Sequence, residues 1–477
     1  MDIALRIGGR FETGTGAPER IFNPRNGKVI AEVPEASPAQ VEEAVAAAAD
    51  AFESWSRTTP AERSLMLLRL ADLIERDAAA YADLEALNCG KPRHLVLADE
   101  VPAIVDCFRF FAGAVRTMHG PLAGEYLAGH TSMIRRDPVG VVASIAPWNY
   151  PLMMAAWKLA PALAAGNTIV LKPSEQTPLT ALKLAKHLAG IFPEGVANIV
   201  CGRGESVGQK LISDPRVAMI SLTGDVGTGR KVLAAAQATL KRTHLELGGK
   251  APVIVFDDAD LDAAVQGALA SKYRNTGQTC VCTNRFLVQK GVYEDFAQRL
   301  TTAVGKLKVG DGLKGPTDQG PLIDMAAVNK VEEHVADALA KGGKLLTGGK
   351  RHALGGQFYE PTVITGATKA MLLAREETFG PVAPLFSFAT ESEAIALAND
   401  TEFGLASYIY TRDLARSWRV SEALEYGIVG LNTGLISTEV APFGGIKESG
   451  FGREGSKYGI LDYTEMKYVC VGGITPL

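Results

Sequence analysis

The chain has 477 residues, of which 47% are hydrophobic and 21% are charged, and it carries 50 glycines and 24 prolines. These proportions are those of an ordinary globular protein and exclude a disordered or collagen-like chain. The 49 Lys and Arg residues nearly balance the 53 Asp and Glu residues, so the net charge is −4. Without basic runs, we expect neither a nucleic acid nor an anionic membrane as partner.

The same features predict a soluble, cytoplasmic protein of two or three domains. Six cysteines are too few for a disulfide scaffold in a chain of this length, and the first residues lack the pattern of a signal peptide. Residues 138–157 are uncharged and long enough to cross a membrane, but Pro147, Asn149 and Pro151 interrupt them. The seven histidines show no metal-ligand spacing, so we expect no metal site.

The first third of the chain predicts helices, followed by a hairpin. Apolar residues recur at helical spacing over 38–55, 61–88 and 99–118, and Ser37-Pro38 and Thr59-Pro60 are start signals. Residues 120–136 are polar and interrupted by glycine, and they end in an alternating run. We expect them to form a hairpin that reaches away from the main body.

From residue 139 onward, strand patterns alternate with helix patterns. The first block has strands at 139–145, 168–171, 197–200, 217–222, 243–246 and 252–256, with helices at 152–165, 178–191, 205–213, 226–239 and from 260. The second block has strands at 284–288, 361–364, 382–388 and 406–410, with helices at 292–305, 325–341, 391–399 and 414–425. Such alternation predicts parallel sheets in an α/β fold of two lobes, and residues 462–471 predict one more strand.

Three side chains occupy positions where chemistry is plausible. Cys280 follows a polar, glycine-containing loop, which favours an accessible thiolate nucleophile over a buried structural cysteine. Glu246 ends an apolar strand, where it is either an ion-pair partner of Lys250 or a base with a raised pKa. Asn149 lies on a rigid turn, where its amide either satisfies the backbone or donates to an oxyanion.

Two glycine clusters follow strands. Residues 204–208 match the G-x-S-x-G pattern of hydrolases, but Gly202 and Arg203 separate the strand from the serine, so a helix start is the preferred interpretation. Residues 224–229 lack the dinucleotide fingerprint. They indicate only that backbone amides at a helix start could face a phosphate.

Six motifs together make the chain resemble the aldehyde dehydrogenase superfamily along nearly its whole length. They are PWNYP (147–151), KPSE (172–175), LELGGK (245–250), NTGQTC (275–280), EETFGP (376–381) and PFGGIKESG (442–450). The resemblance implies an α/β fold with a Rossmann-type cofactor domain (1–119 and 138–247), an α/β catalytic domain (248–445) and a small β oligomerisation element (120–137 and 446–477). It also implies a homodimer or homotetramer.

The resemblance assigns a role to each candidate catalytic residue. Cys280 would attack the aldehyde carbonyl, and Asn149 with the Cys280 N–H would hold the oxyanion. A hydride would pass to the nicotinamide ring and leave a thioester, and Glu246 would then activate water to release the acid.

The implied cofactor is NAD, with NADP possible. Lys172 and Glu175 would lie at the adenosine ribose, where a carboxylate favours two free hydroxyls over a 2′-phosphate, and Glu377 and Phe379 at the nicotinamide ribose and ring. The other implied cofactor-binding residues are Pro147, Trp148, Ser174, Gly204, Gly208, Thr223, Gly224, Gly229 and Leu247. Asp225 departs from the family, which commonly has serine there, and places an acid near the expected pyrophosphate.

The two halves resemble different branches of the family. Residues 1 to about 265 resemble γ-aminobutyraldehyde dehydrogenases, through strings such as DEVPAIVDCFRFFAGA (99–114), whereas the chain from about 271 resembles succinate-semialdehyde dehydrogenases, through strings such as YRNTGQTCVCTNRFLVQ (273–289). Divergence, recombination and engineering all remain open as the origin. Arg274 and Ser437 would bind a substrate carboxylate, whereas Tyr150 and Trp157 resemble the aromatic walls around the tail of an aminoaldehyde.

We therefore expect NAD(P)-dependent oxidation of a short semialdehyde, with succinate semialdehyde preferred because Arg274 should repel an ammonium tail. The alternatives are an ω-aminoaldehyde or another aliphatic aldehyde as substrate, a cofactor-independent thioester or ester hydrolase, and a catalytically silent homologue. In the succinate-semialdehyde branch, a Cys-x-Cys pair like Cys280 and Cys282 is a candidate redox switch. A disulfide between them would be strained and easily reduced.

Overall fold

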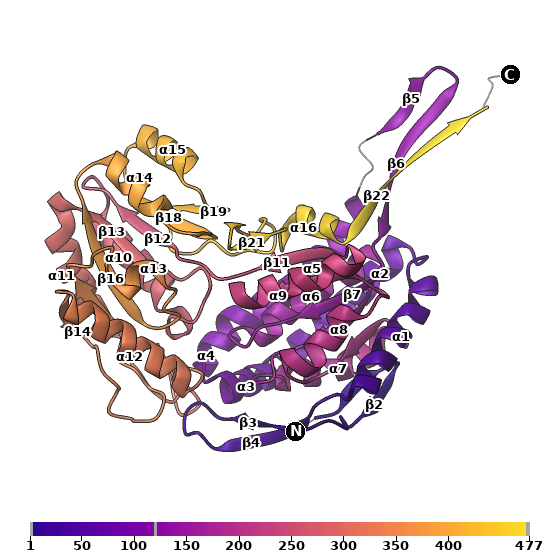
Figure 1. The fold of residues 1–477 in the computed structure, drawn as a ribbon, viewed down its shortest axis with the longest axis horizontal. Coiled ribbons are helices and arrows are strands. Elements are labelled where there is room, and N and C mark those ends of the chain that lie inside the picture. Colours follow the sequence, from indigo (N-terminus) through magenta and orange to yellow (C-terminus); the bar gives the residue numbers. More distant parts are fainter. Residues whose placement is uncertain (1–2, 119–121, 474–477) are drawn as a thin grey trace.

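The computed structural model describes residues 3–118 and 122–473, and it contains two large sheets with a thin three-stranded ribbon that projects from one of them (Figure 1). The predicted α/β class is confirmed. Residues 119–121, at the start of the predicted hairpin, lie outside the described residues, as do residues 1–2 and 474–477 at the outer ends of the expected domains.

The first sheet has eight strands in the order β2-β1-β9-β8-β7-β10-β11-β21. Its five central strands, β9, β8, β7, β10 and β11, run parallel to one another. On one side β1 pairs antiparallel with β9 and β2 pairs antiparallel with β1, and on the other side β21 pairs antiparallel with β11. The strands are β1 (Leu5–Ile7), β2 (Arg10–Glu12), β7 (Val141–Ile145), β8 (Thr168–Lys172), β9 (Ala197–Ile199), β10 (Val217–Thr223), β11 (Arg242–Glu246) and β21 (Gly450–Phe451). Strands β7 and β8 are buried along nearly their whole length, because helices pack against them.

Helices of the first lobe are α1 (Pro38–Trp55), α2 (Pro60–Arg76), α3 (Ala78–Cys89), α4 (Arg93–Leu95), α5 (Val101–Ala114), α6 (Pro151–Ala165), α7 (Leu179–Ile191), α8 (Gln209–Ser213) and α9 (Val226–Ala236). Helices α1 and α6 pack against β8, while α2 and α5 form a layer outside α6. The predicted starts of α1 and α2 are confirmed, because Ser37 and Thr59 each form a capping box with the residue three positions on.

Two helix predictions need correction. The single helix expected over 61–88 is two helices, because the backbone of Asp77 leaves the helical conformation (φ −96°, ψ 17°). The helix expected over 99–118 begins as a π-helical turn at Val96–Glu100, continues as α5 and ends in a 3₁₀ turn at Val115–Thr117.

The second sheet has seven strands in the order β14-β15-β16-β13-β12-β18-β19, parallel except for β14. Its strands are β12 (Pro252–Val255), β13 (Arg285–Gln289), β14 (Lys344–Thr347), β15 (Thr362–Thr365), β16 (Val382–Phe388), β18 (Ala406–Tyr410) and β19 (Ile428–Leu431). Its helices are α10 (Leu261–Lys272), α11 (Tyr293–Val304), α12 (Met325–Ala340), α13 (Leu372–Arg375), α14 (Glu391–Asn399) and α15 (Leu414–Ala423). The chain therefore crosses between the two sheets at 247–251.

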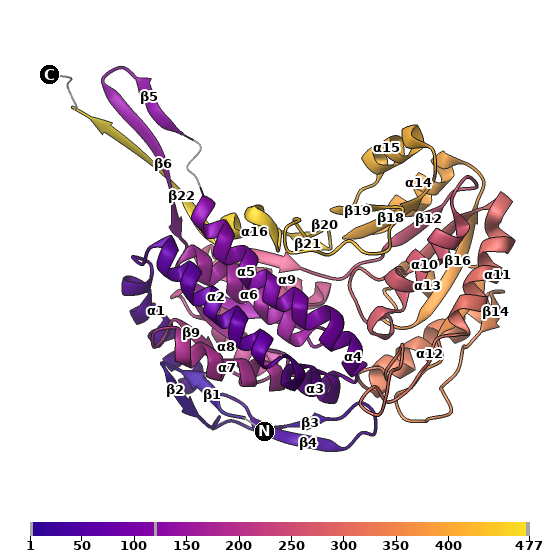
Figure 2. The ribbon, with the colours of Figure 1, turned by 180° about the vertical axis from the view of Figure 1, so that it is seen from behind.

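Smaller elements complete the fold, and both views show the ribbon standing clear of the main body (Figures 1 and 2). In this ribbon β6 (His130–Pro138) lies between β5 (Ala123–Leu127) and β22 (Thr464–Gly472), with Thr464 opposite Pro138 and Gly472 opposite His130. The remaining elements are β3 (Pro18–Phe22), β4 (Val29–Pro34), β17 (Phe403–Gly404), β20 (Ile446–Lys447) and α16 (Ser456–Asp462). Among the described residues, no helix combines the length and the apolarity that crossing a membrane requires.

A buried ion pair joins α6 to the segment that precedes α16. Lys158 Nζ lies 2.7 Å from Glu454 Oε1 and donates to Ser221 Oγ at 3.1 Å, and both charged side chains are almost fully buried. Glu454 Oε2 has no hydrogen-bond partner among the described residues. A buried carboxylate of this kind depends on its single cation.

We expect Lys158→Met to lower the melting temperature by several degrees, because it leaves the Glu454 carboxylate buried without its cation, at a cost of about 3–5 kcal/mol. Differential scanning calorimetry measures the change. Lys457→Met, at an exposed position of α16, is the control, and Lys158→Met with Glu454→Gln should recover part of the loss. A melting temperature unchanged in Lys158→Met would contradict the prediction.

Candidate active site

A cavity of about 960 Å³ opens where the two sheets meet. Its lining includes residues at the carboxyl ends of four adjacent parallel strands, β8, β7, β10 and β11, together with the loops that carry Cys280 and Glu377. After β7 the chain adds β8 and then β9 on one side of β7, and it later adds β10 and β11 on the other side. The strand order therefore reverses at β7, and the carboxyl end of the sheet there is a topological switch point. Ligands of α/β sheets bind at such points.

The cavity brings together nearly all of the site residues predicted from the sequence, and three stay outside it: Gly208, Gly229 and Cys282. A Cβ at Gly229 would lie 2.7 Å from Leu247 Cδ1, so this glycine lets α9 pack closely against the end of β11. Gly208 lies in the π-helical turn Gly204–Gly208, and only Gly204 of that turn reaches the cavity.

The loop that carries Cys280 is held in an unusual backbone conformation. Asn275 and Thr276 have φ values of 48° and 57°, a left-handed region that costs energy for residues with a side chain. Gly277 follows with φ 76°, and a Cβ there would lie 2.2 Å from the carbonyl oxygen of Gly380. Gln278 Oε1 accepts from the Ile323 N–H at 2.9 Å, which ties the loop to a distant segment.

Asn149 lies beside this loop. Its Nδ2 donates to the Gln278 carbonyl at 3.1 Å, and its main-chain carbonyl accepts from Asn275 Nδ2 at 3.0 Å. An amide nitrogen carries two hydrogens, so one donor remains for a group in the cavity. This arrangement suits an oxyanion donor.

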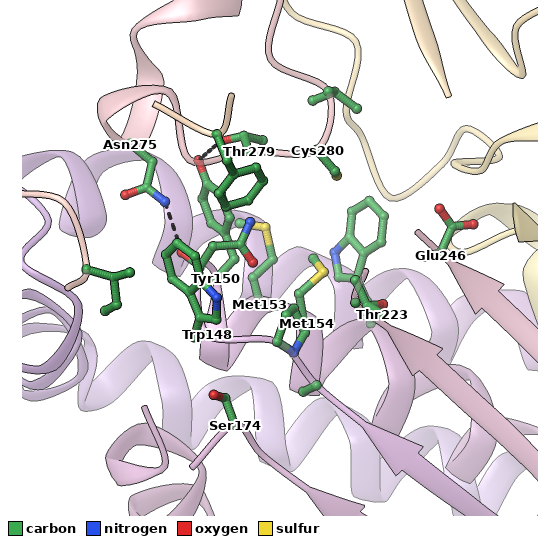
Figure 3. A pocket seen from close by; sticks show the side chains of 18 of the residues that line it. Trp148, Tyr150, Met153, Met154, Ser174, Thr223, Glu246, Asn275, Thr279 and Cys280 are labelled. Carbon is green, nitrogen blue, oxygen red and sulfur yellow. Dashed lines mark hydrogen bonds between the residues drawn. The ribbon is translucent and has the colours of Figure 1, made fainter. Parts of the chain in front are cut away.

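Glu246 ends β11 and lines the cavity, across from Met153 and Met154 (Figure 3). Neither of its carboxyl oxygens has a hydrogen-bond partner among the described residues, and the side chain is almost fully buried. Burial, assisted by the nearby Glu454 carboxylate, raises the pKa of Glu246 well above its ordinary value. An unpartnered carboxyl with a raised pKa can take up a proton near neutral pH, as a general base must.

The pKa of the Cys280 thiol is also shifted. Burial and the carboxylates of Glu377 and Glu246 raise its pKa, and the Arg274 guanidinium only partly opposes them. In this arrangement the thiol is protonated, so nucleophilic attack requires that its proton be removed. The Glu246 carboxyl, whose pKa is raised and whose oxygens have no hydrogen-bond partner among the described residues, has the capacity to accept it.

One half of the cavity fits a dinucleotide. The Trp148 and Phe379 rings meet edge to face at 5.4 Å, and Glu377 Oε1 accepts from the Gly249 N–H at 3.1 Å. A Cβ at Gly248 would lie 2.9 Å from Glu377 Oε2, so the glycine makes room for this carboxylate. Burial raises the pKa of Glu377 to about 7. The lining carboxylates suit ribose hydroxyls, as the resemblance predicts.

Lys172 and Glu175 lie together in that half. Lys172 Nζ donates to the Gly202 and Pro173 carbonyls at 2.7 and 3.0 Å and pairs with Glu175 Oε2 at 3.3 Å. The lysine therefore balances part of the glutamate charge. This balance weakens the repulsion that Glu175 would exert on a 2′-phosphate.

Asp225 caps α9 rather than turning away from it. Its Oδ1 accepts from the Thr228 N–H at 2.9 Å and its Oδ2 accepts from Thr228 Oγ1 at 2.6 Å. These hydrogen bonds outweigh the effect of burial and lower its pKa, so the carboxylate is ionised. An anion of the protein thus occupies part of the positive end of the helix that a pyrophosphate would use.

The other half of the cavity is aromatic, and the cations Lys91 and Arg274 lie near its Tyr150 ring. Trp157 meets Phe443 edge to face at 5.2 Å, and the Tyr150 hydroxyl lies 3.2 Å from Thr279 Oγ1. The Arg274 guanidinium lies 5.9 Å from the centre of the Tyr150 ring. Within the described part of the chain, no carboxylate forms an ion pair with Arg274.

Several lining residues escaped the sequence analysis. They include Lys91, Asp99, Glu100, Met153, Met154, Lys330, Leu435, Glu439, Phe443 and Glu454. Met153 and Met154 follow the PWNYP motif on α6, so their position was a usable signal. Lys91 lies in the connection between α3 and α4, and Glu100 ends the π-helical turn before α5, where the sequence gives no sign of a cavity.

Cys282 is buried outside the cavity. Its thiol lies 3.5 Å from the Lys272 carbonyl oxygen, and Cys280 and Cys282 are both free. A disulfide between them would require the Cys282 side chain to turn toward the cavity. The redox role of Cys282 stays a prediction.

Comparisons with known proteins agree with this geometry. The sequence pattern described as "Aldehyde dehydrogenase family" matches residues 12–469. The mitochondrial succinate-semialdehyde dehydrogenase of Arabidopsis thaliana is 50% identical over 468 residues, which cover 98% of this chain and 88% of that protein. The glutarate-semialdehyde dehydrogenase of Pseudomonas aeruginosa is 50% identical (98% and 97% covered), and the NADP(+) succinate-semialdehyde dehydrogenase of Escherichia coli is 49% identical (98% and 97%).

Solved structures show the same fold. The succinate-semialdehyde dehydrogenase of Burkholderia pseudomallei superimposes with a TM-score of 0.96 at 50% identity, covering 98% of each chain. The betaine aldehyde dehydrogenase of Staphylococcus aureus in complex with NAD+ gives a TM-score of 0.96 at 38% identity, covering 100% of this chain and 96% of that one. The alignments extend across both halves of the chain and do not separate the two, so the two-part resemblance stays a prediction. This chain belongs to the aldehyde dehydrogenase family.

Proposed function

We propose that this protein oxidises succinate semialdehyde to succinate with NAD(P) as the electron acceptor. The observation that carries the proposal is the content of one cavity: a cysteine, an unpartnered carboxyl and a guanidinium without a carboxylate partner. The cysteine and the carboxyl supply the nucleophile and the base of aldehyde oxidation. The guanidinium supplies a contact for an acidic tail.

The proposed reaction uses the chain's own residues as follows. Glu246 takes the proton of the Cys280 thiol, and the sulfur attacks the aldehyde carbon to give a thiohemiacetal whose oxyanion accepts from Asn149 Nδ2 and the Cys280 N–H. Bound NAD(P)+ supplies the acceptor for the hydride that leaves this carbon, and a thioester remains on Cys280. Once Glu246 has released the first proton to solvent, it removes a proton from water, which attacks the thioester. The acid then leaves, and Glu246 returns this proton to the Cys280 sulfur.

NAD is the proposed cofactor, with NADP accepted. Glu175 and Glu377 would hold the two riboses, and Trp148 and Phe379 would border the nicotinamide ring. Because Lys172 balances part of the Glu175 charge, a 2′-phosphate is disfavoured rather than excluded. Among the relatives, the Escherichia coli enzyme is named for NADP(+) and the Staphylococcus aureus structure holds NAD+.

The substrate proposal depends on Arg274 and Ser437. Relatives of about 50% identity are named for succinate semialdehyde and glutarate semialdehyde, both of which end in a carboxylate. One observation favours an ω-aminoaldehyde instead: Asp99, Glu100 and Glu439 line the same cavity as Trp157 and Tyr150. A cofactor-independent hydrolase or a silent homologue would form no acid in response to added NAD(P).

We also propose that the chain acts in the cytoplasm as a homodimer or homotetramer assembled through the projecting ribbon. Tyr126, Leu127, Met466 and Tyr468 of this ribbon are each more than half exposed. Exposed apolar side chains on a strand edge are typical of a surface that a second copy covers.

We expect a higher kcat/KM for succinate semialdehyde than for γ-aminobutyraldehyde, by about tenfold or more, because Arg274 attracts one tail and repels the other. Initial rates of cofactor reduction with NAD+ in excess measure both values. Arg274→Met should raise the KM for succinate semialdehyde about tenfold or more and change that for butanal, an uncharged aldehyde of the same length, much less. A preference for the amino substrate would refute the substrate assignment and favour the acidic residues of the cavity.

We expect the affinity for NAD+ to fall as the pH drops through about 7. The pKa of Glu377 is raised to about 7, so its carboxylate is available to ribose hydroxyls above that pH and protonated below it. Between about pH 8 and pH 6 the dissociation constant should rise about fivefold to tenfold. Fluorescence titration measures this constant. Glu377→Gln should bind weakly with little pH dependence over this range, and an equally steep profile in that variant would assign the titration to another group.

We expect Asp225→Asn to tighten NAD+ binding about threefold or more, because asparagine can still cap α9 but no longer repels the pyrophosphate. The gain should shrink at high salt, which screens the charge of an exposed side chain. Asp260→Asn, at the N-cap of α10 outside the cavity, is the matched control and should leave binding unchanged. An identical dissociation constant in the parent and in Asp225→Asn would show that the carboxylate does not face the cofactor.

A further inference from the structure

Three charged side chains form a cluster at the aromatic wall of the cavity, and two of them, Lys91 and Glu100, belong to its lining. Lys91 Nζ lies 2.6 Å from Glu100 Oε2 and 3.3 Å from Glu85 Oε1, and only 2% of the Lys91 side chain is exposed. Burial opposes the charged form of this lysine, but the carboxylates of Glu100 and Glu85 outweigh it and raise its pKa. Lys91 is therefore a permanent cation with two carboxylate partners.

Lys91 and Arg274 both lie near the ring of Tyr150. The Lys91 ammonium lies 3.9 Å from the centre of Tyr150, and the Arg274 guanidinium lies 5.9 Å from the same centre. Tyr150 reaches through its hydroxyl to Thr279, the residue before the nucleophile. The buried cluster is thus adjacent to the place where the tail of the aldehyde would lie.

The two carboxylates of the cluster are not equivalent. Glu100 lines the cavity and is an electrostatic neighbour of Arg274, whereas Glu85 does not line the cavity. A carboxylate beside an unpaired guanidinium ordinarily forms an ion pair with it. In this structure Glu100 is bound to Lys91 instead, and Arg274 has no carboxylate partner among the described residues.

Glu100 is the carboxylate among the main charges that act on Arg274, and two further acids of the lining are less able to compete for it. Asp99 is exposed and Glu439 is partly exposed, so water and salt screen their charges, whereas the Glu100 side chain is only 12% exposed. Glu100 is therefore the internal competitor of a substrate carboxylate.

We propose that Lys91 is a positioning residue that sets substrate specificity: by holding Glu100, it keeps the Arg274 guanidinium free for the carboxylate of the aldehyde. This inference rests on the proposed contact between Arg274 and the substrate tail. It also accounts for a cavity that contains acidic residues and yet takes an acidic substrate.

The test compares succinate semialdehyde with butanal in the full-length protein, and its readout is the ratio of the two kcat/KM values. Lys91→Met should lower this ratio about tenfold, through a higher KM for succinate semialdehyde, because Glu100 then turns to Arg274. An equal loss for both aldehydes would overturn the proposal, since it would mean that the lysine only supports the shape of the wall.

Two double variants separate the carboxylates. Lys91→Met combined with Glu100→Gln should return the ratio to within about threefold of the parent, because the competitor is gone. Lys91→Met combined with Glu85→Gln is the matched control and should stay low, since Glu85 does not reach the cavity. Equal recovery in both double variants, or recovery in neither, would overturn the proposal.

Two further variants keep the test decisive. Glu100→Gln alone should change the ratio of the two kcat/KM values less than about threefold, because Lys91 already holds this carboxylate. A tenfold rise of this ratio would overturn the proposal. This variant tests the proposal even where Lys91→Met does not fold. Lys183→Met is the control for a lysine over a tyrosine elsewhere, since Lys183 Nζ lies 4.9 Å from the Tyr81 ring and should not affect the ratio. If Arg274→Met leaves the ratio unchanged, the proposed function fails; if Arg274→Met lowers it and Lys91→Met does not, only this inference fails.

Discussion

The site depends on one close approach between two backbones. A Cβ at Gly249 would lie 2.4 Å from the carbonyl oxygen of Cys280, so the chain that crosses between the sheets touches the loop that carries the nucleophile. Because the crossing begins directly after Glu246, main-chain contact fixes the proposed base and the proposed nucleophile relative to each other.

Burial shifts acids and bases of the site toward neutral pKa values. It raises the pKa of Glu377 to about 7 and lowers the pKa of Lys272, behind the nucleophile loop, to about 8. Lys91 lies instead within hydrogen-bond distance of Glu100 and Glu85, and these carboxylates raise its pKa despite burial. A counter-ion at this distance thus separates Lys91 from Lys272, whose pKa burial lowers.

Much of the architecture could be predicted from the sequence because its local signals are strong. The capped starts of α1 and α2 and the apolar runs of β7 and β8 are visible without tertiary information. The four short strands before residue 35 escaped detection, since β1 and β2 have three residues each and gain their stability from pairing with one another and with β9. The break at Asp77 was equally hidden, because no glycine or proline marks it.

The residues of the candidate site likewise fall into those that the sequence could predict and those that it could not. Cys280, Glu246 and Asn149 belong to compact motifs, so the sequence identified them and the fold brings them into one cavity. Lys91 lies in the connection between α3 and α4 and Glu100 ends a π-helical turn, and no motif marks either position. Their place at the cavity depends on how these segments pack beside Tyr150. Asp225 stood out as a departure, but only its contacts with Thr228 reveal that it caps the helix.

The short strand β21 has a consequence for the order in which the protein is made. Leu245 of β11 pairs with Phe451, so the edge of the first sheet closes only after the whole second lobe has been synthesised. Until residue 451 has left the ribosome, the end of β11 and the Glu246 carboxyl have no strand beside them on that edge. During synthesis, the first sheet therefore keeps an unpaired edge at β11 until β21, about 200 residues later in the chain, is available to pair with it.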